Sequence, residues 1–459
     1  MVCFIGFIHL NPLYSQTSDD QYRRPLSDVI KDIETRYNVT IRDPEYLVQD
    51  QWILYADWRF RPDVEKTLQN VLAPANLVYH KEGENMYKLK KYEYYRLTVE
   101  EGKELLDSLS AKYNDVASWE ARKRKLRECI WKAIRLSPLP EQPKSQPILT
   151  PARKMYGYTV QNIAIETLPG VYVCGSLYKP EHYSGKIPVI LCPNGHFNKG
   201  RYNESVQIRC AMFAKMGAIA INYDLFGWGE YQLQFDYQDH NRSLAMTMQE
   251  LNNIRILDYL LSLPEADTER VGMTGGSGGG SQTMLITALD ERIKVSAPVV
   301  MLSCYFNGGC PCESGLPVHL CGGRSSNLEF SAMAAPRPQL IISDGDDWTD
   351  HVPELEYPFV QRIYGFYGKK EVVQNVHIVD ESHDYGPSKR FPVYEFMAKE
   401  LNLNLDAVKD KKGNIDESTV SVEKENAMYV FGKKGENLPA NAIKGFNELE
   451  EVFNNSVKH

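Results

Sequence analysis

Residues 271–280, Val-Gly-Met-Thr-Gly-Gly-Ser-Gly-Gly-Gly, decide how this chain is expected to fold. A short apolar strand ends here in a run of glycines, and a helical stretch over 282–289 follows directly. Glycines let a chain turn sharply from strand to helix, which would hold the hydroxyl of Ser277 in a strained, exposed position above a sheet. The stretch therefore predicts a nucleophile elbow with Ser277 as nucleophile. A glycine-rich turn without chemistry, or an anion cradle at a helix N-terminus, are the plainer alternatives.

Around this stretch, from residue 157 onward, short and nearly continuous apolar runs alternate with helical patterns. Such runs are typical of strands that are buried on both faces, and their alternation with helices favours an α/β fold with a mostly parallel sheet. An amphipathic helix is expected over 244–261. The expected strands are 189–192, 218–221, 271–274, 295–301, 340–342 and 376–379.

Length and charge limit the classes of function. The 459 residues suggest two to three domains, and a net charge of −8 without a basic block excludes nucleic acid as a partner. An apolar run over 2–10, followed by Tyr14-Ser15-Gln16, predicts a signal peptide over 1–15 and a periplasmic or secreted protein, although no Lys or Arg precedes the run. A buried N-terminal strand is the alternative. No later segment has the length of a membrane helix, so no membrane insertion is expected.

The segment 17–92 has the pattern of a separate small α+β domain, in which nothing looks catalytic. Its expected elements are helices near 26–33 and 64–72 and strands at 39–41, 77–79 and 86–89. We expect the catalytic domain over 97–402, opening with a helical lead-in over 97–136, and a C-terminal extension over 403–459.

A serine needs a base to remove its proton, and in this fold the acid and then the histidine follow the nucleophile along the chain. His383, on a loop after the strand at 376–379, is best placed, and His351 is the substitute. Asp347, beyond the strand at 340–342, is the expected acid because it can reach the far ring nitrogen of His383. Asp346 is a close alternative.

Two preorganised N–H groups would complete an oxyanion hole. Gly278, directly after the nucleophile, supplies one. The loop Pro193-Asn194-Gly195-His196-Phe197 follows a strand and supplies the other, from His196 or Phe197, although a Gly-His pair can also be a simple turn.

Four cysteines lie close together in the sequence at positions 304, 310, 312 and 321. In an oxidising compartment they could form one or two disulfides, whose pairing cannot be read from spacing. Zinc is the rival interpretation, but the C-x₂-C, H-x₃₋₅-H and H-E-x-x-H spacings are all missing. We therefore expect neither a metal nor a cofactor.

Several of these motifs together resemble a known family, the α/β-hydrolase carbohydrate esterases that are acetylxylan-esterase-like. The resemblance covers residues 150–400. With its small first domain and Cys310-Pro311-Cys312, the chain looks most like the bacterial pectin methylesterases of this fold from gut Bacteroides. The small domain, with its leading Pro25-Leu26-Ser27-Asp28-Val29-Ile30, resembles the secretin and TonB short N-terminal domain, which implies a protein partner. The family motifs are Pro193-Asn194-Gly195-His196, Asp224-Leu225-Phe226-Gly227-Trp228-Gly229-Glu230, Thr274 to Gly280, Asp347-Trp348-Thr349 and His383-Asp384-Tyr385-Gly386.

This resemblance implies a serine carboxylic-ester hydrolase that demethylates methyl-esterified galacturonan, so that its partner is a pectic oligosaccharide or polysaccharide. Free galacturonates are anionic, which makes Arg201 and Arg324 candidates for carboxylate binding. Trp228 is a candidate for stacking on a sugar ring. An acetyl (xylan) esterase is the nearest alternative, and a non-catalytic glycan-binding or docking protein is a second.

Overall fold

The computed structural model describes residues 22–93, 96–313 and 316–457. Contacts divide the chain into two compact units, one up to residue 94 and one from residue 95 onward. The segment 1–15, expected to be a signal peptide, lies outside the described residues. None of the helices within the described ranges has the length and apolar composition that a bilayer crossing needs.

The smaller unit is the α+β domain that the sequence pattern predicts. Two helices bury their apolar stripes in a core of their own, against the three-stranded sheet β2-β5-β4, in which β2 and β5 are parallel and β4 and β5 antiparallel. Its elements are β1 (Arg23–Pro25), α1 (Leu26–Tyr37), β2 (Thr40–Arg42), β3 (Trp52–Leu54), α2 (Val64–Leu72), β4 (Leu77–Gly83) and β5 (Met86–Lys91).

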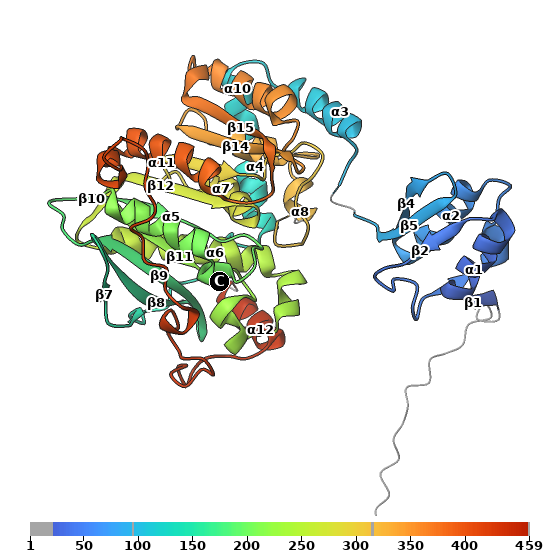
Figure 1. The fold of residues 1–459 in the computed structure, drawn as a ribbon, viewed down its shortest axis with the longest axis horizontal. Helices are drawn as coiled ribbons and strands as arrows, with labels where there is room; N and C mark the ends of the chain where they lie inside the picture. Colours follow the sequence, from blue (N-terminus) through green and yellow to red (C-terminus); the bar gives the residue numbers. More distant parts are fainter. Residues whose placement is uncertain (1–21, 94–95, 314–315, 458–459) are drawn as a thin grey trace, which may run out of the picture. The chain divides into compact units, whose positions relative to one another are not determined.

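A ten-stranded sheet forms the centre of the larger unit (Figure 1). Its strands run in the order β15-β14-β13-β12-β10-β11-β9-β8-β6, with β7 paired to β8. The six strands from β15 to β11 are parallel, and the others join antiparallel. The sheet confirms every strand expected from the apolar runs. The strands are β6 (Ile148–Leu149), β7 (Arg153–Lys154), β8 (Tyr158–Leu168), β9 (Val171–Pro180), β10 (Ile187–Leu191), β11 (Ile219–Tyr223), β12 (Ala266–Gly276), β13 (Val295–Val299), β14 (Gln339–Asp346) and β15 (Val373–Ser382).

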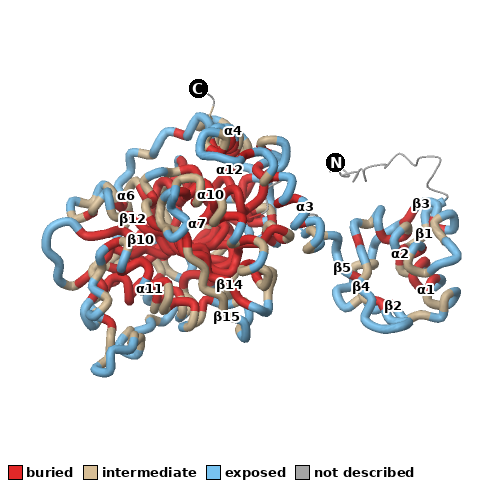
Figure 2. Tube along the Cα trace, turned by 90° about the horizontal axis from the view of Figure 1, so that it is seen from above, coloured by how far each residue is buried: buried red, intermediate tan, exposed pale blue. Residues whose placement is uncertain are grey.

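Helices cover both faces of this sheet, which makes the fold an α/β-hydrolase fold. On one face α5 and α11 pack on the strands in one apolar cluster, and on the other α4, α6, α7 and α10 share a second, larger cluster. The buried residues accordingly concentrate along the sheet (Figure 2). The helices are α3 (Val99–Ser110), α4 (Val116–Ala133), α5 (Glu204–Lys215), α6 (Ala245–Ser262), α7 (Gly278–Leu289), α8 (Leu316–His319), α9 (Asn327–Ala332), α10 (Tyr357–Phe366), α11 (Pro387–Leu401) and α12 (Phe446–Ser456).

The segment after residue 403 packs closely on the larger unit. Helix α12 buries Phe446, Leu449 and Phe453 in the larger apolar cluster. Upstream of it, the backbone N–H groups of Val430 and Phe431 donate to the buried carboxylate of Glu230. The C-terminal segment therefore stabilises the loop that follows β11.

Candidate active site

Ser277 lies at the sharp turn between β12 and α7. Its backbone has φ 56° and ψ −125°, a region that costs a residue other than glycine about 1–3 kcal/mol. The Ser277 N–H donates to the carbonyl of Val299 on β13 at 3.0 Å, which fixes the turn. At Gly275 a Cβ atom would lie 2.5 Å from the carbonyl oxygen of Gly279, so the turn requires glycine there. The backbone has the strained conformation that the glycine run predicts.

His383 and Asp347 are brought together by two neighbouring parallel strands. Asp347 follows β14, His383 follows β15, and Nδ1 of His383 lies 2.6 Å from Oδ2 of Asp347. The other oxygen of Asp347, Oδ1, accepts from both the N–H and the hydroxyl of Thr349, at 2.5 and 2.6 Å. Asp346 is exposed, so of the two candidates Asp347 is the one that the structure pairs with His383.

The pKa values of two neighbouring carboxyl groups, Asp347 and Asp344, are shifted in opposite directions. Burial alone would raise the pKa of Asp347, but hydrogen bonds from His383 and Thr349 hold that pKa below its ordinary value. Burial, followed by the negative charge of Asp347, raises the pKa of Asp344 to about 6. Asp347 is therefore the carboxylate that stays ionised and fixes the proton of the imidazole on Nδ1.

His351, the substitute candidate, and the nearby His377 have different surroundings. His377, within β15, has its Nδ1 2.8 Å from the hydroxyl of Ser343. His351 lies beside Asp350, with 3.7 Å between the ring nitrogen and the carboxylate, and against the ring of Tyr305. Neither of the two is among the described residues that line the pocket of Ser277.

Ser277 and His383 line one pocket of about 330 Å³. Within the described residues, no hydrogen bond joins the hydroxyl of Ser277 to an imidazole. Catalytic hydrogen bonds are often long before substrate binds and shorten in the complex, so the shared pocket is the relevant observation. The walls are aromatic: the ring centroids of Trp348 and Phe197 lie 4.4 and 5.7 Å from that of His383, and Phe306 packs on Trp348.

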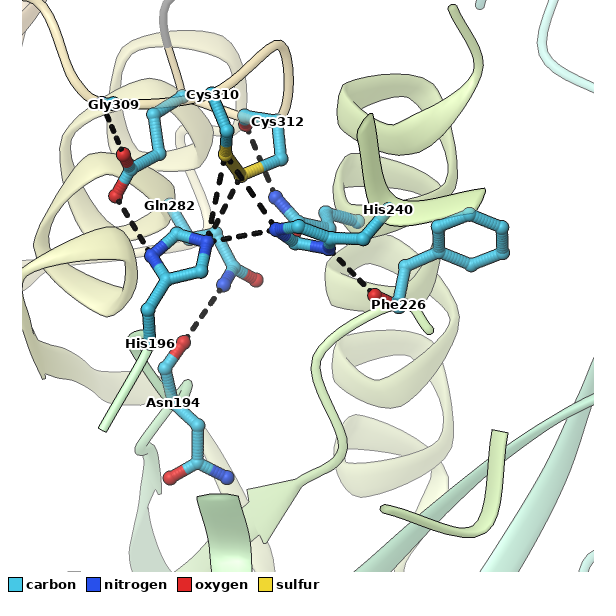
Figure 3. Close-up of a disulfide and its surroundings, with 10 residues drawn as sticks. Asn194, His196, Phe226, His240, Gln282, Gly309, Cys310 and Cys312 are labelled. Carbon is cyan, nitrogen blue, oxygen red and sulfur yellow. Dashed lines mark hydrogen bonds and ion pairs between the residues drawn. A yellow bond between two sulfur atoms is a disulfide. The ribbon is translucent and has the colours of Figure 1, made fainter. Parts of the chain in front are cut away.

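The expected oxyanion loop runs directly beside the elbow. A Cβ on Gly195 would lie 2.4 Å from the carbonyl oxygen of Gly276 and 3.1 Å from the backbone nitrogen of Gly278. Only a glycine permits this approach, so the loop that carries His196 and Phe197 lies against the elbow, and both residues line the pocket of Ser277. The ring of His196 lies at the edge of the pocket, with its Nε2 directed into a cluster with His240 and two cysteines (Figure 3).

The structure contradicts the substrate-binding role expected of Arg201 and places Arg324 outside the Ser277 pocket. Arg201 is completely buried and donates to Asp224 at 2.8 Å and to Glu230 at 2.5 Å. Arg324 is exposed on a turn after α8 and does not line the Ser277 pocket. Within the described lining of that pocket there is neither a lysine nor an arginine.

Trp228 likewise lies outside the Ser277 pocket. It lines a neighbouring cavity of about 510 Å³, together with three tyrosines and two lysines. Its ring also packs against His196, with 5.9 Å between centroids, so the tryptophan separates this cavity from the cluster beside Ser277. The three tyrosines are Tyr202, Tyr237 and Tyr429, and the two lysines are Lys199 and Lys433.

The sequence analysis missed three residues of the pocket wall. Phe306, Gly309 and Glu313 come from the loop after β13, which carried no motif beyond its cysteines. Burial would raise the pKa of Glu313, but the nearby His196 holds it below the ordinary value, so this wall carries a negative charge. Trp348 lies in the family motif Asp347-Trp348-Thr349, and its place beside the expected acid was the only sequence indication that it lines the site.

One disulfide lies within the sequence cluster of cysteines, and a second joins the cluster to a distant cysteine. Cys310 is bonded to Cys312, while Cys321 is bonded to the distant Cys129 and Cys304 is free. The expectation of one or two disulfides in this region is confirmed, with one partner from outside the cluster.

The arrangement is suited to acyl transfer. A serine on a strained elbow, an imidazole oriented by an ionised carboxylate, and a glycine-lined helix N-terminus are the components of a serine hydrolase. The imidazole nitrogen that is not held by Asp347 remains available to take the serine proton.

Comparisons with known proteins agree with this chemistry. Residues 152–309 match the family model of acetyl xylan esterase (AXE1). The acetyl esterase Axe7A of Xylanibacter ruminicola is 27% identical over 190 residues, which is 36% of this chain and 41% of that protein. The chain thus spans about two fifths of the length of that curated relative. The solved structure of the methylesterase BT1017 is 47% identical and matches with a TM-score of 0.84, over 96% of this chain and 98% of that one. The chain therefore belongs to the same family of α/β-hydrolase esterases as that methylesterase and is a carboxylic-ester hydrolase.

Proposed function

We propose that the protein removes methyl groups from methyl-esterified galacturonan by a Ser277-His383-Asp347 mechanism. The observation that carries the substrate class is the likeness to a methylesterase over nearly the whole of both chains, whereas the likeness to an acetyl esterase covers about a third of this chain. The aromatic walls around His383 can pack against a sugar ring.

The mechanism follows from the positions of the side chains. The hydroxyl of Ser277 attacks the ester carbonyl while Nε2 of His383 takes its proton, and Asp347 stabilises the resulting imidazolium. The N–H of Gly278 and one N–H of the 193–197 loop stabilise the oxyanion. His383 returns the proton to the departing methanol, and a water molecule then hydrolyses the acyl-enzyme by the same route.

A polymeric substrate extends beyond the sugar residue that carries the ester, and the cavity beside Trp228 can hold the neighbouring sugar residues. Three tyrosines and a tryptophan give flat surfaces for sugar rings, and Lys199 and Lys433 can pair with free carboxylates. We assign to these lysines the anion-binding role first expected of Arg201 and Arg324.

The product distinguishes the two ester classes. Purified protein is incubated with methylated pectin and with acetylated xylan, and methanol and acetate are measured, with Ser277→Ala as the inactive control. We expect methanol from pectin and little acetate from xylan. Release of acetate without methanol would contradict the methyl-ester proposal and favour an acetyl esterase.

We also propose that the small unit contacts another protein, as its resemblance implies. Several large aromatic side chains are exposed on it, among them Trp52 at 51% and Trp58 at 83%. A photo-crosslinking amino acid at position 58 should give a discrete protein adduct in the native cells, whereas one at the exposed Tyr183 of the larger unit should not. Equal or absent crosslinking at both positions would contradict this proposal.

A further inference from the structure

Four side chains with metal-binding atoms converge beside the nucleophile. His196 comes from the loop after β10, His240 from the 3₁₀ helix η6 (Tyr237–Asn241), and Cys310 and Cys312 from the loop after β13. One ligand atom from each of the four lies within 4.8 Å of the others (Figure 3). His240 and both cysteines are buried, and His196 is half-buried.

The acceptor groups on the far side of each ring favour one tautomer of each histidine. Nδ1 of His240 lies 2.6 Å from the carbonyl oxygen of Phe226, and because a carbonyl only accepts, this nitrogen carries the proton. Nδ1 of His196 faces Oε1 of Glu313 in an ion pair at 3.4 Å, and a carboxylate favours a proton on the ring nitrogen that faces it. In the neutral rings, both Nε2 atoms are then unprotonated.

These two unprotonated nitrogens nevertheless face each other at 2.7 Å. Two lone pairs at that distance repel unless a proton or a cation lies between or beside them. A carboxylate or a backbone carbonyl on the outer nitrogen is also the usual support of a metal-bound histidine. Glu313 and Phe226 provide one such support each.

The sulfur–nitrogen distances fit a tetrahedral ion. Zinc bonds of about 2.3 Å to sulfur and 2.0–2.1 Å to nitrogen place a sulfur and a nitrogen ligand about 3.5 Å apart and two nitrogen ligands about 3.3 Å apart. The two Nε2 atoms, now 2.7 Å apart, would therefore separate by about 0.6 Å when the ion binds. Sγ of Cys310 lies 3.5 Å from Nε2 of both His196 and His240, and Sγ of Cys312 lies 3.3 Å from Nε2 of His196.

We propose that His196, His240, Cys310 and Cys312 bind one zinc ion when the two cysteines are reduced. Each thiol gives up one proton as its sulfur binds the ion, so two protons leave and the two thiolates balance the charge of Zn²⁺. The disulfide between Cys310 and Cys312 is the alternative state of this pair, formed from the two metal-free thiols by exchange with a second disulfide, which takes their two electrons and two protons and becomes two thiols. The sequence spacing argued against zinc because the ligands come from three separate loops.

With four protein ligands the site is closed, which is typical of structural rather than catalytic zinc. A bound zinc ion would hold the three loops together beside the elbow. A Cβ on Gly278 would lie 2.9 Å from Cε1 of His196 and 2.7 Å from Oε1 of Glu313, so the cluster packs directly on the expected oxyanion donor. We assign the four ligands a positioning role.

A second group of metal-binding atoms, Cys174, Asp224 and Glu230, does not support the same inference. The guanidinium of Arg201 already pairs with both of its carboxylates. A cation at that place would lie against an existing positive charge.

Metal content tests the proposal without relying on any substrate. The full chain is purified without chelator in the presence of a phosphine reductant, and zinc is measured by mass spectrometry of the elements. We expect about one zinc per chain, and less than about a tenth in the Cys310→Ser/Cys312→Ser double variant. The matched control, Cys129→Ser/Cys321→Ser, removes the other bonded pair and should keep the metal.

Cobalt gives a second readout that does not depend on the folding of a variant. Co²⁺ added to the reduced, metal-stripped wild-type chain should produce the intense visible spectrum of tetrahedral thiolate-bound cobalt, and added Zn²⁺ should abolish it. Absence of both zinc and the cobalt spectrum in reduced protein would overturn the proposal. Equal zinc in the wild type and the Cys310/Cys312 double variant, or a disulfide between the pair that resists the reductant, would also overturn it.

Discussion

Replacing Asp347 with asparagine should abolish most of the activity through the tautomer of one histidine. Oδ1 of Asp347 accepts two hydrogen bonds from Thr349, whose hydroxyl in turn accepts from the N–H of Asp344. Both groups of Thr349 that face Asp347 are therefore donors. The carbonyl oxygen of an asparagine must occupy the same position, which turns its NH₂ group toward His383.

An NH₂ group at that position donates to Nδ1 of His383, where the carboxylate now accepts at 2.6 Å. The ring proton then moves to Nε2, and this nitrogen can no longer take the proton of Ser277. In serine hydrolases this change lowers kcat about 10⁴-fold, which corresponds to about 5 kcal/mol of transition-state stabilisation.

The assay is kcat for release of methanol from methylated pectin, with thermal unfolding measured beside it. Asp346→Asn is the matched control, because Asp346 is the exposed neighbour with the same chemistry, and it should keep kcat within about twofold of the wild type. A folded Asp347→Asn variant that keeps more than about a tenth of kcat would refute this account of the histidine. Equal losses in both variants would refute it as well.

Three further predictions concern the surroundings of the site. Arg201→Ala should lower the free energy of unfolding by about 3–5 kcal/mol, because it leaves two buried carboxylates without a positive partner. Arg324→Ala, the control, should change neither stability nor KM. A change in KM alone for Arg201→Ala would contradict the structural role. Burial raises the pKa of Glu250 to about 8 from an ordinary 4.5, so folding takes up a proton and stability falls as the pH rises between these values. Glu250→Gln should therefore match the wild type near pH 4.5 and be more stable at pH 8, by ~4 kcal/mol at most, in urea unfolding; a difference that does not depend on pH would contradict the raised pKa. Gly195→Ala should lower kcat about 100-fold, as loss of an oxyanion donor does, because its Cβ would force the loop off the elbow that carries Ser277; unchanged kcat would exclude this loop from catalysis.

Local pattern was sufficient to predict the six parallel strands and the elbow at Ser277, but not the antiparallel strands β6 to β9. Strands buried on both faces must be apolar along their whole length, and a sharp turn after a strand needs glycine, so residues 271–280 specify the elbow without knowledge of the rest. The acid and the histidine follow from chain order in this fold, and the pairing of Asp347 with His383 agrees with that order.

Pairings between distant loops could not be predicted in this way. An arginine after the oxyanion loop has the same sequence context whether it faces solvent or, as Arg201 does, two buried carboxylates 23 and 29 positions away. The cluster of His196 with His240 joins residues 44 positions apart, and neither lies at a known ligand spacing. Such contacts depend on how three loops pack together, which the hydrophobic periodicity of the strands does not encode.

The central claim is that Ser277 is a nucleophile activated by His383, and covalent labelling tests it most directly. The full chain is treated with a serine-directed phosphonate, and the adduct is located by mass spectrometry of the intact protein and of its peptides. We predict one adduct per chain, on Ser277, absent in Ser277→Ala and formed far more slowly in His383→Ala. A folded wild-type protein that stays unlabelled, or that carries the label on another residue, would contradict the account and favour a glycan-binding protein without catalysis.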